Sequence, residues 1–183
     1  MTVINSRWSK EPNKLLVKYL ADLKTGKVLD LGGSDGTNAI FLARNGFEVM
    51  NIDKDNAALN DLKIFANENN LNIHTEGADL NNYIINDTYD DIISFFTFHF
   101  LKLSSGDKLI DSIQEHTATD GINIIVGFTD QGEFNINHKK CYFVGDYLVN
   151  KYKSWDVLLH DKVIGGTKSG MNQEREILVA RRR

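Results

Sequence analysis

Hydrophobic positions along the chain follow two alternating patterns. Runs with apolar residues three and four positions apart predict helices, and short continuous apolar runs bounded by turn residues predict buried strands. The helical spacing covers residues 12–24, 38–45, 55–64, 106–113 and 145–152. The strand-like runs cover residues 28–31, 47–52, 71–74, 89–96, 122–128, 155–160 and 176–180.

Strands that alternate with helices are typical of βαβ units, in which a parallel sheet carries helices on both faces. The last two strand-like runs have no helical pattern between them, only Gly165, Gly166 and Gly170. We therefore predict an α/β fold, a three-layer sandwich around a mostly parallel seven-stranded sheet whose last strand is antiparallel. No shift in composition divides the chain, so residues 1–183 are expected to form a single domain.

Composition and charge exclude several function classes. The chain has 21 basic and 25 acidic side chains, a formal net charge of −4, so no nucleic-acid partner is expected. No apolar run reaches the ~18 residues of a membrane span, and the N-terminus lacks the apolar core of a secretory signal. These features predict a cytoplasmic protein with no membrane partner. The single cysteine, Cys141, excludes an internal disulfide and a multi-cysteine metal site, and no metal ligands are predicted.

A glycine-rich turn follows the first strand, from Asp30 to Gly36. A dinucleotide fingerprint requires the spacing G-x-G-x-x-G, and neither register of this turn matches, because other residues occupy required glycine positions. The template acidic-x-Gly-x-Gly-x-Gly fits at Asp30, Gly32 and Gly36, with Ser34 in place of the central glycine. A tight strand–helix connection without any ligand is the structural alternative.

A second acidic residue, Asp53, ends the second strand. It lies 17 positions after Gly36, close to the ~20 positions that separate a ribose-binding acid from a Rossmann-type turn. A carboxylate at that place accepts charge-assisted hydrogen bonds from ribose hydroxyls. As a single residue Asp53 would also serve as a helix cap, but the turn and the spaced acid together favour a nucleoside-containing ligand.

With these motifs the chain resembles class I S-adenosylmethionine (SAM)-dependent methyltransferases. Within that class it is most similar to the small tellurite-resistance (TehB-like) methyltransferases. The segments that carry the resemblance are residues 30–36, 37–49, 53–54, 77–80, 89–101, 142–155 and 177–181. The resemblance implies a Rossmann-like fold, SAM as cofactor, and a monomer or homodimer. The N-terminal segment and helix, residues 1–25, would be able to close over the site as a lid.

The resemblance also implies which residues contact SAM. It places Asp79 near the adenine amino group, Leu80 near the adenine ring, and the end of the fourth strand at the methyl-transfer site. The expected cofactor-binding residues are Asp30, Gly32, Gly33, Ser34, Gly36, Asp53, Lys54, Asp79, Leu80, Ser94 and Phe95. Ser34 departs from the family pattern, and it would be strained if the turn requires a positive φ there.

The predicted function is methyl transfer from SAM to a small-molecule acceptor. An acceptor that must lose a proton needs a general base, and His99 after the fourth strand is the candidate; a structural role for His99 is the alternative. A soft anion such as tellurite needs no base. Residues 164–170 lack the polar, His-containing segment of the family, and the lone Cys141 falls in a loop expected to cover the site. A non-catalytic SAM-binding or regulatory module is the second hypothesis, and a Rossmann-type oxidoreductase is the third.

Overall fold

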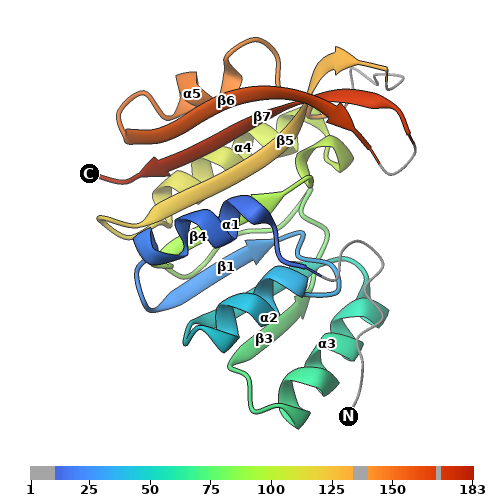
Figure 1. Ribbon diagram of the computed structural model, residues 1–183, viewed down its shortest axis with the longest axis vertical. Helices are drawn as coiled ribbons and strands as arrows, with labels where there is room; N and C mark the ends of the chain where they lie inside the picture. The colour runs from blue at the N-terminus through green and yellow to red at the C-terminus, as the bar shows by residue number, and fades with distance from the viewer. Residues whose placement is uncertain (1–10, 134–139, 168–169) are drawn as a thin grey trace.

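The computed structural model describes residues 11–133, 140–167 and 170–183, which contain a seven-stranded sheet in the order β3-β2-β1-β4-β5-β7-β6 (Figure 1). The strands are β1 Lys27–Leu31, β2 Glu48–Asp53, β3 Ile73–Gly77, β4 Asp91–Phe95, β5 Ile122–Gly132, β6 Asp156–Gly166 and β7 Asn172–Arg181. The α-helices are α1 Lys14–Tyr19, α2 Thr37–Arg44, α3 Asn56–Glu68, α4 Leu103–Glu115 and α5 Tyr147–Lys151, with 3₁₀ turns η1 Leu20–Asp22 and η2 Phe98–Phe100.

The direction of the strands confirms the predicted α/β sheet. Strands β1 to β5 pair in parallel with their neighbours, whereas β7 pairs antiparallel with both β5 and β6. Strand β7 is therefore the antiparallel strand of the sheet, and it starts at the edge where the parallel strands end (Figure 1).

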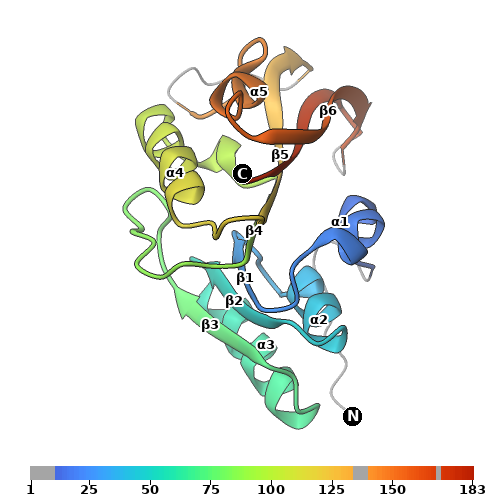
Figure 2. The same cartoon turned by 90° about the vertical axis from the view of Figure 1, so that its left-hand side faces the viewer.

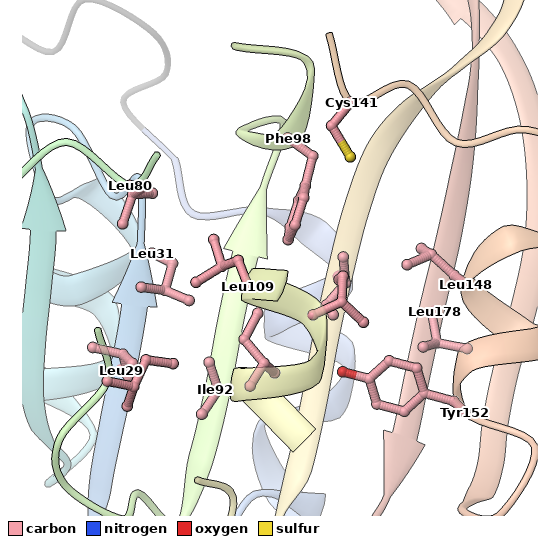
Figure 3. Close-up of a cluster of buried hydrophobic side chains, with 14 of the residues drawn as sticks. Leu29, Leu31, Leu80, Ile92, Phe98, Leu109, Cys141, Leu148, Tyr152 and Leu178 are labelled. Carbon is pink, nitrogen blue, oxygen red and sulfur yellow. The ribbon is translucent and has the colours of Figure 1, made fainter. Parts of the chain in front are cut away.

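Helices cover both faces of the sheet, which gives the three layers that the pattern predicts (Figure 2). Helices α1, α2 and α3 pack on one face against residues such as Val28 and Val49. Helices α4 and α5 pack on the other face against residues such as Leu29 and Leu178 (Figure 3). Neighbouring residues of a strand point to opposite faces, so the continuous apolar runs of the sequence supply both cores.

Several predicted elements have different lengths in the structure. The helix expected over residues 12–24 ends as an α-helix at Tyr19 and as a 3₁₀ turn at Asp22, because Leu23 takes an extended conformation and enters the core. The backbone N–H of Lys24 then donates to the carboxylate of Asp91 at 2.9 Å. The helix expected from residue 55 is confirmed as α3, and the side chain of Asp55 caps it by accepting hydrogen bonds from its first turn.

The C-terminal strands are longer than the apolar pattern predicts. Strand β6 includes Gly165 and Gly166, because its backbone is paired with β7 along its length. Strand β5 was expected to end at residue 128, and it continues to Gly132. Cys141 lies outside the helices and strands, as expected for a loop residue, but its side chain is 1% exposed and packs in the α4–α5 core near Phe98 (Figure 3).

The order of the strands reverses between β1 and β4. Chain connections from these two strands leave in opposite directions, since β2 and β3 lie to one side and β5, β7 and β6 to the other. In open α/β sheets ligands bind in the crevice beyond the carboxyl ends of the strands at such a switch point. The glycine turn after β1 and the aromatic segment after β4 both start there.

Candidate functional site

Two glycines of the turn after β1 combine a positive φ with a lack of room for any side chain. Gly32 and Gly36 have φ of +75° and +78°, a region that residues with a Cβ rarely enter. A Cβ on Gly32 would collide with the side chain of Thr97, and one on Gly36 with Leu62. The backbone N–H groups of Gly32 and Gly33 donate to the carbonyl of Ile52, at 2.8 and 3.3 Å, which fixes the turn against β2.

Ser34 stands at the position where the template has its central glycine. Its φ is +49°, so the condition for the strain that we predicted is met, and a side chain there costs about 1 kcal/mol. The backbone N–H of Ser34 donates to Oδ2 of Asp53 at 2.9 Å. The turn therefore keeps its left-handed bend despite the Ser34 side chain, and the backbone N–H of this residue, which a glycine would also supply, joins the turn to the second acidic residue.

Asp53 is held by the backbone at the carboxyl end of β2. Its Oδ1 accepts from the backbone N–H of Asp55 at 2.9 Å, and its Oδ2 accepts from Ser34. The residue is only half-buried, so its carboxylate is not enclosed in the core. Lys54 follows it on the surface, with Nζ 5.9 Å from the ring centroid of Phe100.

A buried polar pair lies beneath the turn. Asp30 is 1% exposed and Asn51 0%, and the two face each other across β1 and β2. In the part of the chain that the structure describes, Oδ2 of Asp30 and both amide atoms of Asn51 have no hydrogen-bond partner. Burial raises the pKa of Asp30 to about 7, with a smaller contribution from the charge of Asp53. Unsatisfied buried polar atoms next to the turn fit a polar ligand group.

The pair also explains Gly33. A Cβ on this residue would overlap the amide of Asn51 and the carboxylate of Asp30, so the bare backbone of the turn rests directly on these two side chains. Sequence reasoning missed Asn51. Its only trace in the sequence is a polar residue between the apolar residues Met50 and Ile52.

Asp79 and Lys54 belong to the same edge of the sheet. Asp79 is exposed after β3, and hydrogen bonds from the backbone and side chain of Asn81, at 3.0 and 2.8 Å, lower its pKa, with weaker contributions from Lys54 and Lys102. Leu80 is 7% exposed and packs in the core beside Leu31 (Figure 3). Its contact with a ligand would therefore be limited to the small part of the side chain that remains accessible.

The end of β4 is tied to the end of β1 by two hydroxyl groups. Ser94 Oγ and Thr97 Oγ1 both donate to the carbonyl of Leu31, at 3.0 and 3.1 Å, and both side chains are buried. Phe95 is partly buried and packs toward α1, α2 and α3. The side chain of Ser94 thus holds the two strands together at the switch point. Thr97, which the sequence did not single out, additionally packs on Gly32.

His99 lies among aromatic rings further toward β5. Its ring centroid is 4.1 Å from that of Phe100, 4.6 Å from Phe128 and 6.3 Å from Tyr142. Burial, with a smaller contribution from Lys140, lowers its pKa to about 4. The imidazole is therefore neutral at neutral pH, and a base of this pKa withdraws a proton only weakly.

Three further expectations concern metals, membrane spans and the lid. Within residues 11–133, 140–167 and 170–183, no three His, Cys, Asp or Glu side chains gather in a way that could hold a metal ion. None of the helices described is long and apolar enough to cross a membrane. The first ten residues of the expected lid lie outside the described residues.

The site can now be compared with known proteins. The family model described as "Tellurite resistance protein TehB" matches residues 14–178. This chain belongs to the TehB family. The membership covers the glycine turn, both acidic residues of the site and the aromatic segment after β4, all of which lie within the matched residues.

Individual relatives agree with this assignment. A probable SAM-dependent methyltransferase TehB of Haemophilus influenzae (strain ATCC 51907 / DSM 11121 / KW20 / Rd) is 31% identical over 140 residues, which are 76% of this chain and 49% of the relative. A protein named Hemagglutinin 1 of Eikenella corrodens is 30% identical over 140 residues, 76% of this chain and 47% of its own length. The chain thus spans about half the length of these curated relatives.

The fold agrees as well. The crystal structure of TehB from Haemophilus influenzae superposes with a TM-score of 0.86 and 27% sequence identity, over 93% of this chain and 62% of that one. The Rossmann-like α/β fold implied by the resemblance is therefore confirmed for this TehB family member, and the seven strands observed are those of the predicted sheet.

Proposed function

We propose that this TehB family member is a SAM-dependent methyltransferase and that the turn Gly32–Gly36 together with Asp53 holds the cofactor. The observation that carries the proposal is the 2.9 Å bond from the Ser34 N–H to Asp53. It joins the two motifs predicted to bind SAM at the switch point of the sheet. When bound, SAM supplies a methyl group on a sulfonium sulfur, which an acceptor takes by in-line displacement.

The residues present fit this cofactor by their chemistry. Gly32 and Gly33 leave the backbone of the turn bare for close approach, and Asp30 beneath it has an unsatisfied buried oxygen. Asp53 would accept hydrogen bonds from the ribose hydroxyls, and Asp79 would accept one from the adenine amino group. Aromatic side chains after β4 would suit a neighbouring sulfonium cation, because aromatic faces attract positive charge.

The acceptor that we propose is a small molecule that does not need a general base, such as tellurite. One basis is the low pKa of His99, about 4. The other is membership of a family whose model is described as a tellurite resistance protein. A soft anion presents its own lone pair, so the protein needs only to align it and exclude water. Action in the cytoplasm, a monomeric or homodimeric state and the absence of a nucleic-acid partner remain parts of this proposal.

The test is the formation of S-adenosylhomocysteine (SAH) from SAM with tellurite as acceptor. We expect turnover by the wild-type chain and loss of turnover at limiting SAM when Asp53 is replaced by alanine. Asp61→Ala, an exposed acid on α3, is the matched control and should behave as the wild type. SAM binding without turnover on any small acceptor would contradict the enzyme proposal and support the non-catalytic module.

A further inference from the structure

Arg175 is a basic residue at the site edge that the sequence did not single out. It lies on β7, directly opposite Phe128 of β5 and Val163 of β6. Because β7 is antiparallel to β5, its first residues lie at the carboxyl ends of the parallel strands (Figure 1). Arg175 is therefore at the same edge of the sheet as the candidate site, on the side of the switch point away from β2.

The guanidinium of Arg175 is part of a compact cluster with Phe96, His99 and Phe128, which we name the arginine–aromatic cluster. Its central carbon is 5.8 Å from the ring centroid of Phe96. The rings of Phe96 and Phe128 are 5.3 Å apart, and those of His99 and Phe128 4.6 Å apart. Gly165 of β6 leaves room for the guanidinium, since a Cβ there would overlap Nη2 of Arg175.

The charge of Arg175 is not balanced by an acidic side chain of the protein. Among the described residues no carboxylate pairs with it, and its Nε is buried without a hydrogen-bond partner. Its neighbours Glu174 and Glu176 point to the opposite face, where they bind Thr129 Oγ1 at 2.9 Å and His160 Nε2 at 2.9 Å. Residues 1–10, 134–139 and 168–169 contain no aspartate or glutamate. A half-buried charge without a counter-ion is costly, so an anionic ligand would stabilise it.

The arginine–aromatic cluster adjoins the methyl-transfer end of the cofactor site. Phe96 has a φ of +56°, which is unusual for a bulky residue, and its backbone N–H is held by the carbonyl of Val126 at 2.7 Å. This conformation turns the ring out of the path of β4 toward Arg175. The next residue, Thr97, packs against Gly32 of the cofactor turn, so the cluster is linked to that turn in space through Thr97.

We propose that Arg175 binds the anionic oxygens of the methyl acceptor and thereby determines the acceptor specificity of the site. This inference rests on the proposed function. The planar guanidinium presents paired N–H donors that match two oxygens of one anion. The ligand class is a small acceptor bearing either an inorganic oxyanion or a carboxylate. Phe96 and Phe128 would exclude water from the contact, which strengthens it.

The experiment uses one anionic acceptor of each chemical class and one neutral control acceptor. The inorganic probe is tellurite, and the organic probe is 3-mercaptopropionate, with 2-mercaptoethanol as the matched thiol that lacks the carboxylate. SAH formation is measured for the wild type, Arg175→Gln and Arg175→Lys. Arg44→Gln is the control variant, because Arg44 also lies over an aromatic ring, Phe65 at 5.9 Å, but on α2 and α3.

We expect Arg175→Gln to raise the KM for the anionic acceptor at least about tenfold, as for the loss of a charge-assisted pair. The Kd for SAM, the KM for 2-mercaptoethanol and the melting temperature should stay as in the wild type. Arg175→Lys should give an intermediate KM, since lysine keeps the positive charge but lacks the paired N–H donors of the guanidinium. Arg44→Gln should leave the KM of every acceptor unchanged. If the KM of Arg175→Gln rises for tellurite alone, the acceptor class is an inorganic oxyanion. If it rises for 3-mercaptopropionate, the acceptor class is a carboxylate.

An unchanged KM for both anions in Arg175→Gln would overturn the inference, and so would a parallel loss of SAM affinity and melting temperature. If the wild type forms no SAH with any acceptor, the proposed function fails, and the subsite is then tested by calorimetric binding of tellurite and 3-mercaptopropionate to the SAH-loaded protein. Binding that Arg175→Gln abolishes supports the subsite, and absence of binding by the wild type overturns it.

Discussion

Among single residues, Asp30 makes the stability of the fold depend on pH. Its carboxyl is buried beneath the turn, and its pKa rises from 3.8 to about 7. Between these values the folded state keeps a proton that the unfolded state has released. The free energy of unfolding therefore falls as pH rises through this range and levels off above about pH 7.

Replacing Asp30 by asparagine tests this effect. Asp30→Asn should flatten the decline in the free energy of unfolding between about pH 4 and about pH 7, which urea denaturation at several pH values measures. Part of the decline should remain, because burial also raises the pKa of Asp91 to about 7. Asp61→Asn, at an exposed position, is the control. Stability–pH curves for Asp30→Asn and the wild type that run parallel would contradict the assignment.

Gly32 allows a second test of the turn. The cost of its positive φ can be separated from the cost of steric overlap by comparison with Gly46, which has a positive φ but free space around it. Gly32→Ala should lower the free energy of unfolding by more than Gly46→Ala. Both positions have positive φ, +75° and +91°, which costs an alanine about 1 kcal/mol. Only at Gly32 does the added Cβ also meet Thr97, whereas nothing lies within 4 Å at Gly46. Equal losses in thermal denaturation would show that Thr97 moves aside at no cost.

The sequence predicted the residues whose types are dictated by motif spacing and missed those whose role comes from long-range packing. Asp30, Gly32, Gly36 and Asp53 follow from the turn and its distance to the next acid, and the structure brings them together. Arg175 could not be found in this way, because its neighbours come from β4, β5 and β6 and only the register of β7 places it there.

At the scale of elements, Asp91 at the start of β4 joins three segments. Its Oδ1 accepts from the backbone N–H of Ile122 at 2.7 Å, and its Oδ2 accepts from that of Lys24 at 2.9 Å. These bonds fix the start of β5 and the entry to β1 relative to β4. The carboxylate thus sets the relative position of the strands that form the switch point.

Loss of this carboxylate should weaken the whole sheet. Asp91→Ala leaves two backbone donors without partners, which should lower the free energy of unfolding by about 2 kcal/mol or more. Asp87→Ala, four residues earlier at an exposed position, should change it by less than about 0.5 kcal/mol. Urea denaturation of both variants measures the difference, and equal stabilities would contradict a role for Asp91 in joining the strands.

Element boundaries were predicted best where burial dictates the residue types. The core strands β1 and β2 have nearly the predicted bounds, because both of their faces require apolar residues. Strands β6 and β7 were predicted too short, because Gly165, Gly166 and the polar residues of the hairpin are typical of loops. In the structure their backbones are hydrogen-bonded across the hairpin, and the pattern of hydrophobic residues does not reveal this backbone pairing.

At the scale of the whole molecule, the order of the strands makes the site. The sheet brings the ends of β1, β2 and β4 side by side at the reversal of strand order, and β7 adds Arg175 to the same edge. Fold and cofactor class could be predicted because both follow from local motifs on a common architecture. The acceptor could not, since it is selected by side chains from several distant strands.

The most direct test of this account is a calorimetric titration of the wild type and Asp53→Ala with SAM. Asp53 lies at the centre of the site, bound to both the glycine turn and the start of α3. The account predicts that the wild type binds SAM and that the variant binds it with a Kd roughly tenfold to hundredfold higher, through lost charge-assisted bonds. Equal affinities, or no binding of SAM by the correctly folded wild type, would contradict the assignment of the cofactor site.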